Sequence, residues 1–409
     1  MTDTLEYRTP LVVVGGPTGV GKTDLAISLC KVLDGEIVGA DSMQVYKSLD
    51  ALSNKITPQE SRDIIHHIID LVEISDEFDV TAFRETALSV IQKIKDCQRT
   101  PIVVGGTNYY LESLIYENLI SIKDEQTYSE FSNIQLWDML NDVDPSRASM
   151  LHWNDRRRIR RSLNVAASGT THSHLIGNQI SDNRNRLKLR FKKILFFWLI
   201  SDSEVLAKRI KERCEKMLQN GGWNELQRLY HYFTDSKMPE NDLRGACQVI
   251  GFRQFLPCLK SFRCDYTDLP IDLRDSCFSK FVQSTIKYTK KQVKWFKNRI
   301  KKDERIHVFE LNLSSMNLES AVGFCKLKFD GIISESLDNS ENSPSIKSPL
   351  TRYVCDLCQK TCIGDASWHS HLKSKNHRRL LSMKRKVVTP INSTVSTLKD
   401  KYGSMPFSE

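Results

Sequence analysis

The chain has 409 residues, a length that predicts two or three domains, and 27% of the residues are charged. Lys and Arg outnumber Asp and Glu by 59 to 50, and this moderate net charge of +9 makes the distribution of the basic residues more informative than their sum. No apolar run approaches about 18 residues and no secretory segment precedes the first apolar run, so we expect no membrane contact and a cytoplasmic or nuclear protein, with a mitochondrial location left open.

The first informative element is a glycine-rich loop between a predicted strand and a predicted helix. The apolar run 11–14 precedes the loop, and the amphipathic segment 24–33 follows it. In this context backbone amides and a helix N-terminus bind phosphate, and Lys22 adds a mobile positive charge. A glycine-rich turn without a ligand is the alternative. The predicted diphosphate-binding residues are Gly16, Pro17, Thr18, Gly19, Val20, Gly21, Lys22 and Thr23.

A carboxylate and a hydroxyl group are predicted to lie beside this loop. A short apolar strand at 36–40 ends before Asp41, and another at 101–106 ends before Thr107. Sites in open α/β sheets gather beyond the carboxyl ends of the strands. From position alone, Asp41 could hold Mg²⁺, accept a proton or cap a helix, whereas Thr107 could bind a phosphate oxygen or cap a helix. Three such strand ends together favour a site.

The next part of the chain predicts a helical insertion into the sheet. Segments 134–140 and 157–167 have helical periodicity, and a polar loop is expected at 168–185. The apolar run 194–200 is typical of a buried strand, so the chain returns to the sheet there. Further helices are predicted at 203–218, 224–233 and 285–300.

The expected fold is therefore α/β, with a P-loop-type parallel sheet core. Its predicted parts are the first part of the core at 1–120, the helical insertion at 121–190, and the remainder of the core with basic helices at 191–331.

Basic residues gather in three runs. Five arginines lie within 156–161, six Lys and Arg residues within 184–193, and eight within 287–302. The last run is interleaved with aromatic residues, including Trp295 and Phe296. Such runs suit a surface that follows a nucleic-acid backbone. A solvated helix face is the alternative for any one run, and the two aromatic residues could instead anchor the core.

The C-terminal region contains a pattern that is typical of a two-cysteine, two-histidine zinc site. A finger of this size needs its metal to fold. The region is expected to consist of a flexible linker at 332–350, the finger at 351–382 and a disordered tail at 383–409. The predicted zinc ligands are Cys355, Cys358, His371 and His377.

Seven motifs occur in the order in which the tRNA dimethylallyltransferases (tRNA isopentenyltransferases) have them, and the chain resembles this family over roughly its first 300 residues. The finger pattern resembles the eukaryotic branch of the family. The motifs are Gly16–Thr23, Asp41–Tyr46, Gly105-Gly106-Thr107 with Tyr109, Asn154–Ile159, Gly222-Trp223 with Glu225, Gln248–Phe252, and Tyr288–Gln292 with Trp295-Phe296.

The resemblance implies that a dimethylallyl group moves from dimethylallyl diphosphate to the exocyclic amine of the adenine just 3′ of a tRNA anticodon. Asp41 would accept a proton from the amine, and Thr107 would bind the oxygen that leaves. Lys22 and a catalytic Mg²⁺ on Thr23 would stabilise the diphosphate, while Zn²⁺ in the finger is structural. The protein is expected to act as a monomer on the tRNA anticodon stem-loop. Its expected tRNA-binding residues are Asp41, Ser42, Met43, Gln44, Arg156, Arg157, Arg158, Arg161 and Gln248.

The sequence departs from the family pattern at two positions. Lys291 stands where many relatives have arginine and offers only a point charge to phosphate. Gln248 stands where bacterial relatives tend to have arginine, and Arg244 is a candidate to replace it at the diphosphate. The alternative functions are an adenine-nucleotide isopentenyltransferase, a P-loop kinase or ATPase, and an RNA-binding protein without activity.

Overall fold

The computed structural model divides into two compact units, one within residues 1–340 and one within 341–409. Among the helices it describes, none is both long and apolar enough to cross a bilayer. The described residues are 10–117, 128, 130–175, 188–261, 268–338, 352–358, 360–363, 365–374 and 377–378.

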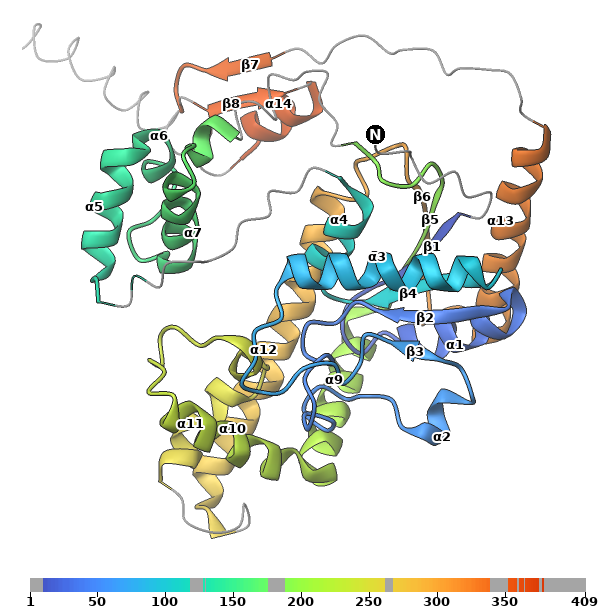
Figure 1. Cartoon of the computed structure of the whole chain (residues 1–409), viewed down its shortest axis with the longest axis horizontal. Helices are drawn as coiled ribbons and strands as arrows, with labels where there is room; N and C mark the ends of the chain where they lie inside the picture. Colours follow the sequence, from blue (N-terminus) through green and yellow to red (C-terminus); the bar gives the residue numbers. More distant parts are fainter. Residues whose placement is uncertain are drawn as a thin grey trace, which may run out of the picture. The chain divides into compact units, whose positions relative to one another are not determined.

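The first unit is built on a six-stranded sheet in the order β3-β2-β4-β1-β5-β6 (Figure 1). All its pairings are parallel, which confirms the predicted core. The central strands are apolar and buried along most of their length, as in parallel sheets that are covered on both faces. The two edge strands, β3 and β6, were not predicted. The strands are β1 Leu11–Gly15, β2 Gly35–Gly39, β3 His66–His67, β4 Thr100–Gly105, β5 Ile194–Ile200 and β6 His307–Asn312.

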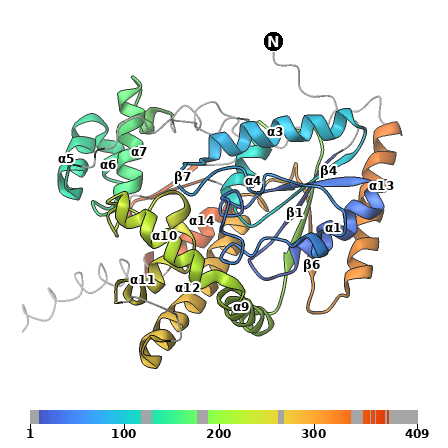
Figure 2. The same ribbon diagram turned by 60° about the horizontal axis from the view of Figure 1, so that its bottom comes forward.

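Helices cover both faces of this sheet. They are α1 Lys22–Leu33, α2 Pro58–Ser61, α3 Val80–Asp96, α4 Asn108–Ile115, α9 Ser203–Met217, α10 Trp223–Asp235, α11 Phe252–Lys260, α12 Ile271–Asn298 and α13 Leu318–Asp338, with a π-helical turn at Leu218–Gly222 and a 3₁₀ turn at Gly245–Gln248. The crossovers through α1 and α3 run in opposite directions across the sheet, so right-handed connections place them on opposite faces. Helix α1 packs against α13, and α4 packs against both α3 and α12 (Figure 2).

An aromatic stack joins α12 to the sheet. The rings of Trp198 on β5 and Phe296 on α12 are nearly parallel, at 2°, with their centroids 3.8 Å apart. Phe296 is fully buried, so it is a core anchor. Trp295 is only partly buried, and its Nε1 donates a hydrogen bond to Glu112 at 3.0 Å. Helix α12 starts at Ile271, well before the start predicted for it.

The insertion is helical, as predicted, and the structure shows that it has a core of its own. Its helices are α5 Asn133–Val143, α6 Pro145–Ala148 and α7 Arg156–Ala167. The core consists of Leu136, Leu140, Ala148, Leu151, Ile159 and Leu163. The loop predicted at 168–185 is confirmed at 168–171, but the prediction is wrong from His172 to Leu175, because these residues are helical. The Thr171 hydroxyl caps this turn by accepting the N–H of His174 at 3.2 Å. Residues 176–185 lie outside the described part.

The predicted linker begins too early. Helix α13 continues to Asp338, past the expected linker start at Ile332, because Ala321, Cys325, Phe329 and Ile332 place a helical apolar stripe in the core. The rest of the predicted linker and the predicted tail lie outside the described residues. The second unit consists of the antiparallel strands β7 Arg352–Cys355 and β8 Lys360–Ile363, followed by α14 Asp365–Leu372.

Candidate active site

The phosphate loop connects β1 to the N-terminus of α1. Gly19 and Gly21 have φ angles of 83° and 103°, a region that favours glycine. Gly21 precedes the helix and provides no side-chain cap, so the first amides of α1 are available to a ligand. The Lys22 ammonium donates hydrogen bonds to the carbonyls of Gly16 and Pro17, both at 3.0 Å. The loop therefore combines a helix N-terminus with a lysine folded over it, an arrangement that binds phosphate.

A second cation, Arg213 on α9, lies close to Lys22. The pKa of Lys22 is lowered to about 8, mainly by burial and also by the positive charge of Arg213, against the opposing effect of the Asp41 carboxylate. Burial also lowers the pKa of Arg213, and its Nε has no hydrogen-bond partner among the described residues. Two poorly solvated cations beside a phosphate loop fit a diphosphate.

Arg213 is not among the site residues predicted from the sequence. The signal was present, because this arginine follows the buried Ile210 and precedes the buried Cys214 on an amphipathic helix. An arginine on the apolar side of such a helix is buried on folding, and a buried arginine usually pairs with an acidic side chain or an anionic ligand.

Asp41 and Thr107 lie together at neighbouring strand ends, as predicted. The N–H of Ser42 donates to Thr107 Oγ1 at 3.1 Å, and the N–H of Met43 donates to Asp41 Oδ1 at 2.9 Å. Thr107 precedes α4 without a side-chain cap bond, so the cap interpretation is wrong for this residue. A Cβ atom on Gly105 would lie 2.1 Å from the carbonyl oxygen of Ala40, so this close approach of β4 to the Asp41 segment requires glycine.

Helix α12 contributes Tyr288 and Gln292 to the same centre. The pKa of the Tyr288 phenol is raised to about 12 by burial and by the Asp41 carboxylate, against the effect of hydrogen bonds with Thr107 and Gln292. Gln292 accepts the N–H of Thr18 at 3.0 Å. Both residues belong to a motif that the sequence analysis noted without giving it a role.

The segment after Asp41 is a well-anchored loop. The two carboxylate oxygens of Glu225 accept the N–H groups of Ala51 and Leu52, each at 2.8 Å. The buried ammonium of Lys55 donates to the Tyr46 carbonyl at 2.6 Å. These contacts hold a loop whose first residues, Asp41 to Gln44, are the ones expected to meet the substrate base.

The remaining predicted tRNA-binding residues are spread over the unit. Arg156 is engaged inside the insertion, where it donates to the carbonyls of Phe131 and Tyr128 at 2.7 and 2.8 Å. Arg157 and Arg158 are exposed on α7. Arg161 donates to the Tyr109 hydroxyl at 3.2 Å.

Two further polar residues have hydrogen-bond partners outside the phosphate loop. The amide of Gln248 is exposed and donates to the Leu243 carbonyl at 3.0 Å. Arg244, the proposed substitute at the diphosphate, pairs with Asp242 at 2.7 Å, and Arg160 of the insertion binds the same carboxylate oxygen at 3.0 Å. The arginine whose charge acts on Lys22 is Arg213.

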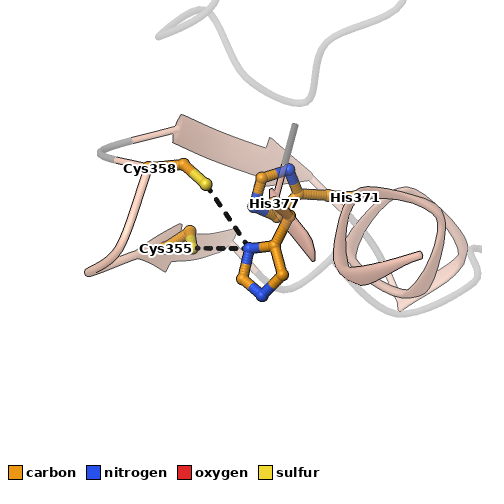
Figure 3. A group of neighbouring side chains, drawn as sticks. All are labelled: Cys355, Cys358, His371 and His377. Carbon is orange, nitrogen blue, oxygen red and sulfur yellow. Dashed lines mark hydrogen bonds between the residues drawn. The ribbon is translucent and has the colours of Figure 1, made fainter. Parts of the chain in front are cut away.

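The predicted zinc ligands meet in the second unit. The ligand atoms of the four side chains all lie within 4.8 Å of one another (Figure 3). Cys355 and Cys358 each place their sulfur 3.4 Å from Nδ1 of His377. The Trp368 ring stacks on Tyr353, with centroids 5.2 Å apart, and gives the finger a small core. Two thiols and two imidazoles at this spacing fit a tetrahedral zinc ion.

Comparison with known proteins identifies both units. A family model described as IPP transferase matches residues 44–299. A second model, described as zinc-finger double-stranded RNA-binding, matches residues 352–378.

Similar proteins cover nearly the whole chain. The tRNA dimethylallyltransferase of Homo sapiens is 32% identical over 96% of this chain and 90% of its own length. The Saccharomyces cerevisiae enzyme of the same name is 31% identical over 91% and 92%. The structure of a eukaryotic dimethylallyltransferase acting on tRNA has a TM-score of 0.64 at 27% identity and covers 96% of this chain and 100% of that one. A tRNA isopentenylpyrophosphate transferase from Bacillus halodurans has a TM-score of 0.55 at 25% identity, over 81% and 98%. The chain therefore belongs to the IPP transferase family.

Proposed function

We propose that this protein is a tRNA dimethylallyltransferase. It transfers a dimethylallyl group from dimethylallyl diphosphate to the exocyclic amine of the adenine 3′ of the anticodon. The observation that carries this proposal is the meeting of a phosphate loop, Arg213, Asp41 and Thr107 at one edge of the sheet in a member of this family. Relatives of similar length from human and yeast carry this name.

The cations stabilise the diphosphate as it leaves. As the allyl C–O bond breaks, negative charge develops on the leaving oxygen, and groups already oriented toward it lower the barrier. The loop amides, Lys22 and Arg213 take this role, and the Thr107 hydroxyl donates a hydrogen bond to the leaving group. Thr23, exposed in the first turn of α1, is the residue to hold Mg²⁺, which supplies further neutralisation when bound.

Asp41 acts on the acceptor amine as a general base. A new C–N bond forms between the adenine amine and the allyl carbon, and the surplus proton on nitrogen passes to the Asp41 carboxylate. An adenine amine is a weak nucleophile. Holding the two reactants together in the right orientation lowers the activation free energy by about 7–11 kcal/mol. The base leaves its stack to reach this edge of the sheet, at low cost in a single-stranded anticodon loop.

The insertion and the finger bind the tRNA. Arg157 and Arg158 are exposed and suit contacts with phosphates. The C-terminal segment matches a double-stranded RNA-binding finger model, which suits the stem. We propose zinc as its metal and a monomer as the working form. The nine described free cysteines form no disulfide, which favours a reducing compartment, the cytosol or nucleus.

One experiment separates this function from its alternatives. Radiolabelled dimethylallyl diphosphate is offered with total tRNA or with AMP, and labelled ATP is offered with tRNA in a parallel reaction. We expect label in tRNA, at an adenosine 3′ of the anticodon. Label in AMP alone would identify an adenine-nucleotide isopentenyltransferase, and phosphate transfer or release from ATP would identify a kinase or ATPase.

A further inference from the structure

The side-chain amide of Gln292 joins two parts of the active site that are far apart in the sequence. Gln292 lies on α12 and is 4% exposed. Its Oε1 accepts the N–H of Thr18 at 3.0 Å, and its Nε2 donates to the Gly106 carbonyl at 2.8 Å. One side chain therefore binds the phosphate loop on one side and the turn before Thr107 on the other.

The surroundings of Gln292 are fitted to this bridge. The Asn108 side chain donates to the backbone carbonyl of Gln292 at 2.7 Å, which anchors α12 to the start of α4. A Cβ atom on Gly106 would lie 2.5 Å from Gln292 Nε2, so this approach needs a glycine. Both bonds need one acceptor and one donor on the same planar group, which the amide provides and a carboxylate does not.

The hydrogen bonds of Gln292 connect the donor site and the acceptor site of the proposed reaction. The donor diphosphate occupies the loop that contains Thr18. The acceptor amine lies beside Asp41, and the Asp41 segment is tied to the turn at Thr107 by the Ser42 to Thr107 hydrogen bond. A misplacement of about 1 Å between reacting groups can lower a rate about a hundredfold. The Gln292 side chain spans the space between the phosphate loop and the turn before Thr107, which follow the paired strands β1 and β4.

We propose that Gln292 is a positioning residue that holds the phosphate loop at the distance from Thr107 at which donor and acceptor react. This inference rests on the proposed function. It distinguishes the buried Gln292 from the lysines on the same helix that are exposed to solvent, such as Lys290 and Lys294. Loss of the bridge should therefore slow the transfer and leave the affinity for tRNA unchanged.

The test uses two variants of the full-length protein and one matched control. Gln292→Glu keeps an acceptor for Thr18 but turns a second acceptor toward the Gly106 carbonyl. Gln292→Met keeps the size and removes both bonds. Gln283→Glu makes the same charge change at an exposed position of α12. Measurements are the single-turnover transfer rate at saturating substrates, tRNA affinity and the melting temperature.

We expect both Gln292 variants to fold and to transfer about a hundredfold more slowly, with the tRNA affinity of the control. A folded Gln292 variant with the wild-type rate would overturn the proposal, and so would a loss of tRNA affinity that accounts for the slower turnover. If neither variant folds, the amide serves the fold and the positioning role is rejected. Absence of transfer by wild type and Gln283→Glu would instead refute the proposed function.

Discussion

At the scale of single residues, the active site depends on a few charges held out of water. Lys22 and Arg213 repel each other and are both desolvated, and Asp41 partly offsets this cost for both. Such an arrangement is unfavourable in the donor-free protein and becomes favourable when a diphosphate enters. Two predictions concern these side chains.

The first prediction concerns the proposed base. Asp41→Asn keeps the side chain's size and an oxygen that accepts the Met43 N–H, so the turn should remain. The affinity for dimethylallyl diphosphate should stay near that of wild type, while the single-turnover rate should fall at least about a hundredfold. Asp96→Asn, at an exposed position near the end of α3, is the control. A fully active Asp41→Asn protein would remove the base assignment.

The second prediction concerns pH and the two cations. Lys22 is charged below its pKa of about 8 and neutral above it, so the affinity for the diphosphate donor should fall as the pH rises through 8. Arg213→Gln should weaken donor binding about tenfold or more by removing a charged hydrogen-bond donor. The same change should move the midpoint of the pH profile upward, because Arg213 lowers the pKa of Lys22.

Donor affinity measured across this pH range checks both parts of that prediction. Lys216→Gln removes an exposed charge from the same helix and should change neither the affinity nor the midpoint. An unchanged midpoint in Arg213→Gln would show that the two cations do not interact.

At the scale of elements, the finger is the part of the protein whose stability depends most on a single bound ion, the proposed zinc. It has two short strands, one helix and a core centred on Trp368. The small apolar surface that the finger buries cannot offset the conformational entropy lost when the chain folds. The free energy of metal binding therefore supplies most of the stability of the finger. The sheet of the first unit has a large apolar core and no such dependence.

The third prediction follows from this difference. Cys358→Ser, or a strong chelator, should abolish stoichiometric zinc binding and unfold the finger, while the melting transition of the first unit stays unchanged. Zinc content and thermal melting measure the two effects. Cys97→Ser, at an exposed position in the first unit, is the matched control and should retain its zinc. A finger that stays folded without zinc would contradict the metal assignment.

At the scale of the whole molecule, the proposed function assigns the chemistry and the RNA binding largely to different parts of the chain. The proposed reacting groups lie at the carboxyl ends of the sheet strands, whereas the exposed arginines of the insertion lie on α7. The insertion is nevertheless tied to the core by the pair of Arg160 with Asp242 and by the bond of Arg161 to Tyr109, two residues after Thr107.

The fourth prediction separates the two activities. Deletion of residues 351–409 should weaken the affinity for tRNA and leave the single-turnover rate at saturating tRNA intact, because every proposed reacting group lies in the first unit. Equilibrium binding and rapid-quench transfer assays measure these quantities. A much slower chemical step in the truncated protein would show that the finger acts on the reaction centre.

Sequence patterns predicted the parts of this protein that are determined locally. The phosphate loop, the carboxyl ends of β2 and β4 and the four finger ligands each follow from short spacings that fix backbone conformation or metal geometry. The edge strands and the end of α13 were harder to predict from the sequence. Short strands and the ends of helices depend on contacts with neighbouring elements for their structure. The short helix at 172–175, within the loop expected at 168–185, was missed for the same reason.

The tertiary structure alone decided which distant side chains complete the site. The hydrogen bond between Thr18 and Gln292 joins residues 274 positions apart, and Glu225 supports a loop more than 170 positions before it. Arg213 acquires its role only when α9 packs beside the phosphate loop. Spacing along a chain encodes local geometry, whereas the meeting of remote segments depends on how whole helices pack on the sheet. That packing brings the Gln292 amide and the Arg213 guanidinium to the phosphate loop, and the Glu225 carboxylate to the loop that follows Asp41.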